Sequence, residues 1–324
     1  MATWRRHGAK RSAGAERGTG VAAFDSFIAM GSLTKALGQI ASLVSRASLE
    51  TESANIHRLG KANKIKGSLS HALDGTMREG AHDMRVFGLG TAASMASVEK
   101  YARFTAAMLA VYKTMEEELD DCVRAAGEAS TTSASAHVWA RHGATLRRAE
   151  RLRADLDDVT DAPGRMRTST PAVQRYVHAI REAGEEDRRT NGGRLIGHVY
   201  CRYFADLFGG QMLQWPYEKA LNLPAGTPRH YHFDFPEDTP ERRAYIESVY
   251  ACINEAGATM ESHKQNATVR EAFRAFRHNV DVYSEDTKLY ADGAAGAINV
   301  ATGGLMSVPE LVSRYLSQSS RARA

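Results

Sequence analysis

Apolar residues recur every three or four positions in two long stretches of the chain, which is the spacing of one face of an α-helix. The stretches fall within residues 101–119 and 273–283 and comprise Tyr101, Phe104, Met108, Val111, Met115 and Leu119, then Phe273, Phe276, Val280 and Tyr283. Alternating, strand-like positions occur only briefly, at 230–235. The pattern predicts an all-α protein.

The placement of proline predicts the same fold class. The chain has eight prolines, none before Pro163 and none between Pro240 and Pro309. Proline breaks a helix interior because it lacks the amide donor and clashes with the preceding turn, so the two proline-free regions favour long helices. We expect the Pro-rich segment 224–240 to be a long connection, 130–136 to be a loop, and the low-charge stretch 289–308 to be a flexible tail.

Composition narrows the class of protein. The 324 residues are 43% hydrophobic and 25% charged, with a formal net charge of +4, which is typical of a soluble globular protein. So small a positive excess predicts no nucleic-acid partner. Three cysteines without a CxxC motif argue against a disulfide scaffold and a cysteine zinc site. No uncharged apolar run reaches about 18 residues, so we expect no transmembrane anchor.

Residues 1–60 differ in character from the rest of the chain. They contain eight Lys or Arg against four Asp or Glu, among abundant Ala, Ser and Gly. An Arg-rich, acid-poor start is typical of an organelle transit peptide, which would place the protein in a plastid or mitochondrion; the alternative is a disordered basic arm on a cytoplasmic protein. We therefore divide the chain into a basic extension at 1–60, a main domain at 61–293 and a C-terminal tail at 294–324.

A glycine pair interrupts an otherwise helical segment at 195–213. Each glycine in a helix interior costs up to about 1 kcal/mol relative to alanine, so Gly209 and Gly210 weaken the helix together. Arg202 and Asp206 are four residues apart and so share one helix face, and the glycine pair follows three and four residues after Asp206. The pair allows either a kink that opens the helix to a ligand, or a helix end or close helix contact beside a surface salt bridge.

The sequence YCRYFADLFGGQ at 200–211 resembles the signature of the heme oxygenase family. Other segments resemble the family in the same order: AVYKTMEEEL at 110–119, TPAVQRYV at 170–177 and EKALNLP at 218–224. The resemblance covers about residues 65–292. It implies a helical bundle with a kinked distal helix over one face of heme, and oxidative cleavage of heme to biliverdin, carbon monoxide and ferrous iron.

Carried over residue by residue, the resemblance implies a set of site residues. His82 would be the proximal ligand to the heme iron, through a neutral imidazole. The polar residues that would deliver protons to dioxygen are Asp206, Arg202, Tyr112, Tyr176 and Asn279, and the residues against heme are Gly209, Gly210, Phe276 and Tyr200. Heme would be substrate and cofactor together, and electrons would come from an external ferredoxin or NADPH-dependent reductase.

The chain also departs from the family pattern. The positions where the family has basic clamps for the heme propionates hold non-basic residues: Gly75 and Glu79, and on a later helix Ile246 and Tyr250. Over the distal face, Ala205 and Phe208 are bulkier than the residues usual in the family. These departures leave a second hypothesis open, a non-catalytic member that binds a tetrapyrrole or acts as a structural or partner subunit. Heme cleavage further requires a slot for a flat macrocycle that side chains do not fill.

A separate candidate is a metal pair at His230 and His232, whose rings would share one face of a strand. No third ligand lies nearby in the sequence, so we expect a solvated loop instead.

Overall fold

The computed structural model describes residues 60–78, 84–128, 132–160, 170–285 and 288–304. The predicted basic extension, apart from residue 60, and His82 lie outside these ranges. Within them the chain is helical and contains no β-strand, which confirms the all-α prediction. No described helix is both long enough and apolar enough to cross a membrane.

Most of the described elements follow one another closely, apart from the long connection between α9 and α10. In chain order they are η1 (Ala62–Lys64), α2 (Leu69–Arg78), α3 (Met84–Ser94), α4 (Val98–Glu128), α5 (Ala134–Leu146), α6 (Ala149–Asp157), α7 (Pro171–Thr190), α8 (Arg194–Ala205), η3 (Asp206–Gly210), α9 (Gln211–Leu221), η4 (Arg229–Tyr231), α10 (Arg242–Ala258), α11 (Ser262–Ser284) and α12 (Leu289–Thr302).

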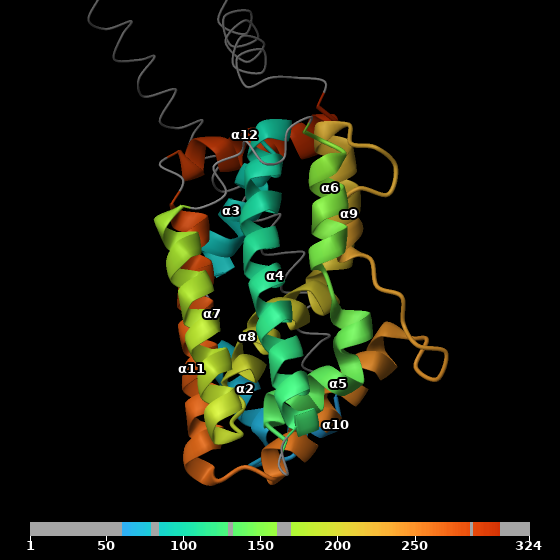
Figure 1. Ribbon diagram of the computed structural model, residues 1–324. Helices are drawn as coiled ribbons and strands as arrows, with labels where there is room; N and C mark the ends of the chain where they lie inside the picture. The colour runs from blue at the N-terminus through green and yellow to red at the C-terminus, as the bar shows by residue number, and fades with distance from the viewer. Residues whose placement is uncertain (1–59, 79–83, 129–131, 161–169, 286–287, 305–324) are drawn as a thin grey trace, which may run out of the picture.

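Helix α4 runs the length of the bundle, with α7 and α11 on one side of it and α5 and α6 on the other (Figure 1). Helix α8 lies in the middle, where it contacts α4, α5, α7 and α11. Every residue from Leu195 to Phe204 is buried, as expected of a helix that is surrounded by others. Both predicted apolar stripes face the core. Tyr101, Met108 and Val111 of the first are at most 1% exposed, and Phe276 and Tyr283 of the second are 3% and 6% exposed.

Local sequence sets where two of these helices begin. Thr170 accepts a hydrogen bond from the amide of Val173, and Pro171 occupies the first turn of α7, where its missing amide costs nothing. The Ser133 side chain accepts from the amide of Ala136 at the start of α5. The predicted loop at 130–136 is therefore wrong from Ala134 onward, where α5 has already begun.

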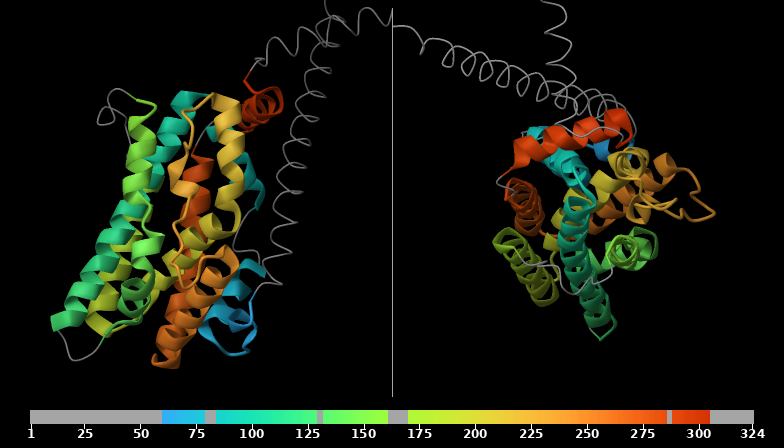
Figure 2. Two further views of the ribbon diagram at one scale, coloured as in Figure 1. Left: turned by 90° about the vertical axis from the view of Figure 1, so that its right-hand side faces the viewer. Right: turned by 90° about the horizontal axis from the view of Figure 1, so that it is seen from above.

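The predicted flexible tail from residue 289 is wrong for residues 289–302, which form α12. This helix packs across α3 at one end of the bundle (Figure 2). A Cβ on Gly296 would lie 1.7 Å from the carbonyl oxygen of Ala92, so glycine allows the two backbones to touch. The predicted domain boundary at 293/294 falls inside this helix. Low charge and glycine content here reflect close helix packing, not mobility.

The long connection between α9 and α10 is confirmed. The solvated loop expected at its two histidines is wrong for His230 and holds only for His232, and the two do not form a metal pair. His230 is buried in the short helix η4, and its Nδ1 is 2.7 Å from a carboxylate oxygen of Asp155. The His232 side chain is 64% exposed. The fully buried Arg148 donates to the His230 carbonyl oxygen at 3.1 Å and holds this connection against α5 and α6.

Candidate active site

The segment with the glycine pair leaves the regular helix as predicted. Residues 206–210 form a π-helical turn between α8 and α9, a distortion that is frequent at functional sites. Helix α8 reaches this point along a close contact with α11, because a Cβ on Gly197 would lie 2.6 Å from the amide nitrogen of Ala272. The close contact fixes where the π turn sits relative to α11.

The two glycines of the pair have different surroundings. A Cβ on Gly209 would meet nothing within 4 Å, so the backbone there borders open space. A Cβ on Gly210 would lie 2.5 Å from the Tyr231 ring. Gly209 therefore fits the predicted opening toward a ligand, whereas Gly210 fits the alternative, a close contact within the protein. The alternative of a surface salt bridge is wrong, because both partners are buried: Arg202 is 4% exposed and Asp206 is 3% exposed.

The structure brings together the five polar residues predicted beside dioxygen, which we call the distal cluster: Tyr112, Tyr176, Arg202, Asp206 and Asn279. They come from α4, α7, α8, η3 and α11, and each is at most 4% exposed. The Tyr112 hydroxyl donates to Asp206 Oδ2. Arg202 donates to Asn279 Oδ1 at 2.8 Å, and its second nitrogen lies 4.0 Å from Asp206 Oδ1. The Arg202 guanidinium also lies 5.2 Å from the Tyr112 ring centroid.

Two polar atoms of the distal cluster have no hydrogen-bond partner among the described residues. They are the Tyr176 hydroxyl and Arg202 Nε, and both are buried. A buried polar group without a partner costs about 1–3 kcal/mol, so such atoms call for a water or a ligand. The Tyr176 ring itself is held by stacking on His278, with ring centroids 5.4 Å apart.

The distal cluster keeps tyrosine protonated and arginine charged. Burial raises the pKa of Tyr112 well above its ordinary value; Arg202 opposes this effect and Asp206 adds to it. Burial alone would lower the pKa of Arg202, but Tyr112, Tyr283 and Asp206 outweigh it, and the pKa is raised. Tyr112 is therefore a fixed hydrogen-bond donor to a buried carboxylate, and Arg202 a fixed positive charge.

Tyr283 belongs beside the distal cluster, although it was predicted only as a core residue. It is 6% exposed, packs edge-on against Phe87 at 5.2 Å, and interacts with the Arg202 guanidinium through its hydroxyl. Its position four residues after Asn279, on the same face of α11, is the signal that identifies it.

A second buried polar group, the Asp74 cluster, consists of Asn63, Asp74, Tyr200 and Tyr250. Asp74 Oδ1 accepts from Tyr200 at 2.6 Å and from Tyr250 at 2.9 Å, and Oδ2 accepts from Asn63 at 2.6 Å. Asp74 is 3% exposed and forms no ion pair with the described residues. The three hydroxyl and amide donors thus hold a buried carboxylate that joins α2 to α8 and α10.

The residues predicted to line heme fit it on one side only. The open backbone at Gly209 and the unpartnered atoms of the distal cluster fit a ligand with water beside it. Tyr200 and Phe276, in contrast, are 4% and 3% exposed, and Tyr200 is bonded to Asp74. On the side of α2 these side chains are therefore packed against the protein itself, and the carboxylate of Asp74, next to Gly75, is buried there.

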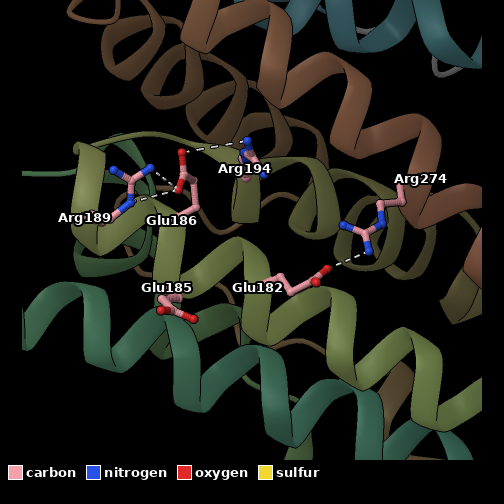
Figure 3. A pocket seen from close by; sticks show the side chains of 6 residues that line it. All are labelled: Glu182, Glu185, Glu186, Arg189, Arg194 and Arg274. Atoms are coloured by element: carbon pink, nitrogen blue, oxygen red, sulfur yellow. Dashed lines mark hydrogen bonds and ion pairs between the residues drawn. The ribbon is translucent and has the colours of Figure 1, made fainter.

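The hollow drawn in Figure 3 lies elsewhere, on the surface between α7, α8 and α11. It has a volume of about 520 Å³ and is lined by three glutamates and three arginines. Arg189 pairs with Glu186 at 2.6 Å and Arg274 with Glu182 at 2.7 Å. This hollow shares no residue with the distal cluster and contributes nothing to the site.

Comparison with known proteins gives the same class as the fold and the distal cluster. A sequence model of the heme oxygenase family matches residues 83–285. Human heme oxygenase 1 is 33% identical over 116 residues, which are 36% of this chain and 38% of that protein. Heme oxygenase from Takifugu rubripes is 28% identical over 194 residues, 60% of this chain and 64% of that protein. The chain thus spans less than two thirds of each of these relatives.

Solved structures share the fold. Heme oxygenase 2 from Chlamydomonas reinhardtii, crystallised without heme, has a TM-score of 0.57 at 20% identity and covers 67% of this chain and 97% of its own. Heme oxygenase-2 from Synechocystis, in complex with heme and NO, has a TM-score of 0.53 at 24% identity and covers 72% and 91%. These matches define an all-α, heme-oxygenase-like bundle. The chain belongs to the heme oxygenase family.

The family match begins one residue after His82. Because His82 also lies outside the described residues, neither the match nor the structure tests its role as the proximal ligand.

Proposed function

We propose that this chain is a heme oxygenase, which cleaves heme to biliverdin, carbon monoxide and ferrous iron with electrons from an external donor. The observation that carries the proposal is the distal cluster, in which five polar side chains from five elements are buried beside a π turn with an open glycine backbone. Each of these buried polar groups costs free energy unless it finds a hydrogen-bond partner. A core that served stability alone would therefore not favour this arrangement.

In this proposal the protein residues hold and direct protons. Heme, when bound, supplies the iron that activates dioxygen. Tyr112 donates to Asp206 Oδ2 and fixes the orientation of that carboxylate, while Arg202 and Asn279 hold each other and complete the polar wall. The unpartnered Tyr176 hydroxyl and Arg202 Nε are the atoms suited to hold water, through which protons would pass to the substrate.

The Asp74 cluster favours the second hypothesis, a member that does not turn over heme. A buried carboxylate bonded to Tyr200 and Tyr250 repels the carboxylates of heme propionates, and it ties α2 directly to α8. Heme cleavage therefore requires the bond between Tyr200 and Asp74 to open when the substrate enters.

Titration of the purified full-length chain with hemin separates the two hypotheses. The enzyme predicts a Soret shift that saturates at one hemin per chain, and conversion to a biliverdin spectrum when a chemical reductant and dioxygen are added. A saturable Soret shift without conversion would support the non-catalytic alternative and contradict the proposed activity. The absence of any shift would contradict heme binding altogether.

The role of His82 is tested with the same titration. His82→Ala should remove the spectrum of a histidine-ligated heme, because the imidazole nitrogen would be lost as a ligand. His178→Ala is the matched control, since His178 lies on a helix surface with its side chain 72% exposed. A His82→Ala spectrum identical to that of the parent would assign the ligand to another residue.

A further inference from the structure

A separate group of ligand-type side chains lies where α5 meets α10, on helices that supply none of the distal cluster. It consists of His137 on α5, and Cys252 and Glu255 on α10, and we call it the α5–α10 cluster. Each residue offers one ligand atom, and the three atoms lie within 4.8 Å of one another. Cys252 and Glu255 are three residues apart, which places them on one face of α10.

The imidazole of the α5–α10 cluster is available for a ligand. His137 Nε2 is buried and has no hydrogen-bond partner among the described residues, although the His137 ring is partly exposed. The nearest carboxylate oxygen, Glu255 Oε2, is 3.6 Å away, which is too long for a hydrogen bond. An imidazole nitrogen, a thiol and a carboxylate therefore converge, with only a long His137–Glu255 contact of 3.6 Å between the nitrogen and the carboxylate.

Arg141, one turn after His137, supplies the positive charge in this arrangement. Its guanidinium pairs with Glu255 at 2.5 Å and interacts with the Cys252 sulfur. The Arg141 side chain is 51% exposed, so it can turn away into solvent at little cost. A cation of higher charge that binds the same carboxylate and sulfur would take its place.

We propose that His137, Cys252 and Glu255 form a binding site for a divalent metal ion of the zinc type. Nitrogen, sulfur and carboxylate oxygen are the ligands that Zn²⁺ and Co²⁺ take in proteins, and three protein ligands leave a fourth position for water. His137 and Arg141 also line a surface hollow of about 510 Å³, which gives solvent access to one side of the site.

Metal binding at this site releases one proton. The Cys252 thiol loses its proton to solvent as the sulfur–metal bond forms. The metal replaces Arg141 as the counter-charge of Glu255 and neutralises the new thiolate. Burial raises the pKa of the free Cys252 thiol to about 11, while Arg141 opposes the increase. The thiol is therefore protonated at neutral pH until a metal is present.

Titration of the full-length chain with Co²⁺ tests the proposal without reference to heme. We expect one equivalent to give a near-ultraviolet band from thiolate-to-cobalt charge transfer, and one equivalent of Zn²⁺ to abolish it. Cys252→Ser should remove the band. Cys122→Ser, which alters a buried cysteine on α4, should keep it.

Three further variants act on the exposed part of the site and leave the core intact. Removing a residue that only hydrogen-bonds to a metal ligand typically weakens metal binding about 10- to 100-fold. His137→Gln and Glu255→Gln remove the ligands themselves, so each should weaken metal binding at least about tenfold. Arg141→Gln should tighten binding at least about fivefold, because it removes the competing cation. No charge-transfer band in the parent and in Arg141→Gln, or an unchanged band in Cys252→Ser, would overturn the proposal.

Discussion

In the proposed function, the hydrogen bond from Tyr200 to Asp74 helps to close the side of the heme site next to α2. Tyr200 lies in the segment that resembles the family signature, yet its hydroxyl is directed at a carboxylate on α2. A hydrogen bond to a charged group contributes about 1.5–3 kcal/mol. If the open state is the one that binds substrate, this bond lowers the apparent affinity by lowering the population of that state.

Tyr200→Phe should therefore raise the affinity for hemin, by roughly 10- to 100-fold, at some cost in stability. The affinity is measured by Soret titration and the stability by urea unfolding. Tyr245→Phe is the matched control, because the Tyr245 hydroxyl is also buried but bonds to the His142 carbonyl oxygen, outside the Asp74 cluster. Equal or weaker hemin binding in Tyr200→Phe would contradict a closing role for this bond.

His142 makes the stability depend on pH. Burial, with help from Arg141, lowers the pKa of His142 from its ordinary 6.5 to about 4. Between these values the unfolded chain binds a proton that the folded chain does not, so stability falls as the pH drops from about 6.5 to about 4, by at most about 1.4 kcal/mol per unit. Above pH 6.5 this contribution is constant.

His142→Gln should flatten that pH dependence, as measured by urea unfolding at pH 7 and pH 5. The ring packs edge-on against Tyr245 at 5.5 Å, so the variant loses some packing at both pH values, but the difference between them should shrink. His178→Gln, on the surface of α7, should leave the difference as it is in the parent. An unchanged difference in His142→Gln would contradict the assignment.

Among the elements, α8 and α11 determine the position of the π turn through the contact at Gly197. Gly197→Ala should lower the free energy of unfolding by about 1–3 kcal/mol, since the new Cβ would lie 2.6 Å from a backbone nitrogen that cannot move freely. Gly127→Ala in α4 is the control, because a Cβ there meets nothing within 4 Å, and it should stabilise by up to about 1 kcal/mol. Equal effects of the two substitutions in urea unfolding would contradict the close contact.

Patterns within single elements predicted most of the helices, because amphipathic spacing and helix breakers act over a few residues. The same patterns misread α12. Gly293 and Gly296 suggested a mobile tail, whereas they allow close packing on α3, which lies about 200 residues earlier in the chain. The glycine pair was recognised as a break, but only the packing of Tyr231 shows that Gly210 serves a contact and Gly209 borders open space.

For the whole molecule, the fold class could be predicted because it depends on local apolar periodicity. The residues of the distal cluster could be predicted because several segments resemble the family in the same order along the chain. The Asp74 cluster could not be predicted in that way. Asp74 meets Tyr200 across 126 positions and Tyr250 across 176, and no local pattern indicates such a pairing. The loss of basic residues at the clamp positions was visible, but the burial of the Asp74 carboxylate beside Gly75 was not.

The central claim, that the distal cluster delivers protons for heme cleavage, is tested most directly by single-turnover conversion of bound hemin in Asp206→Asn. General acid–base groups contribute about 10²–10⁴-fold, so we predict hemin binding within about twofold of the parent and biliverdin formation slower by at least about 100-fold. Asp121→Asn, on the surface of α4, is the control and should convert hemin at the parent rate. Conversion by Asp206→Asn at the rate of the parent would contradict the account.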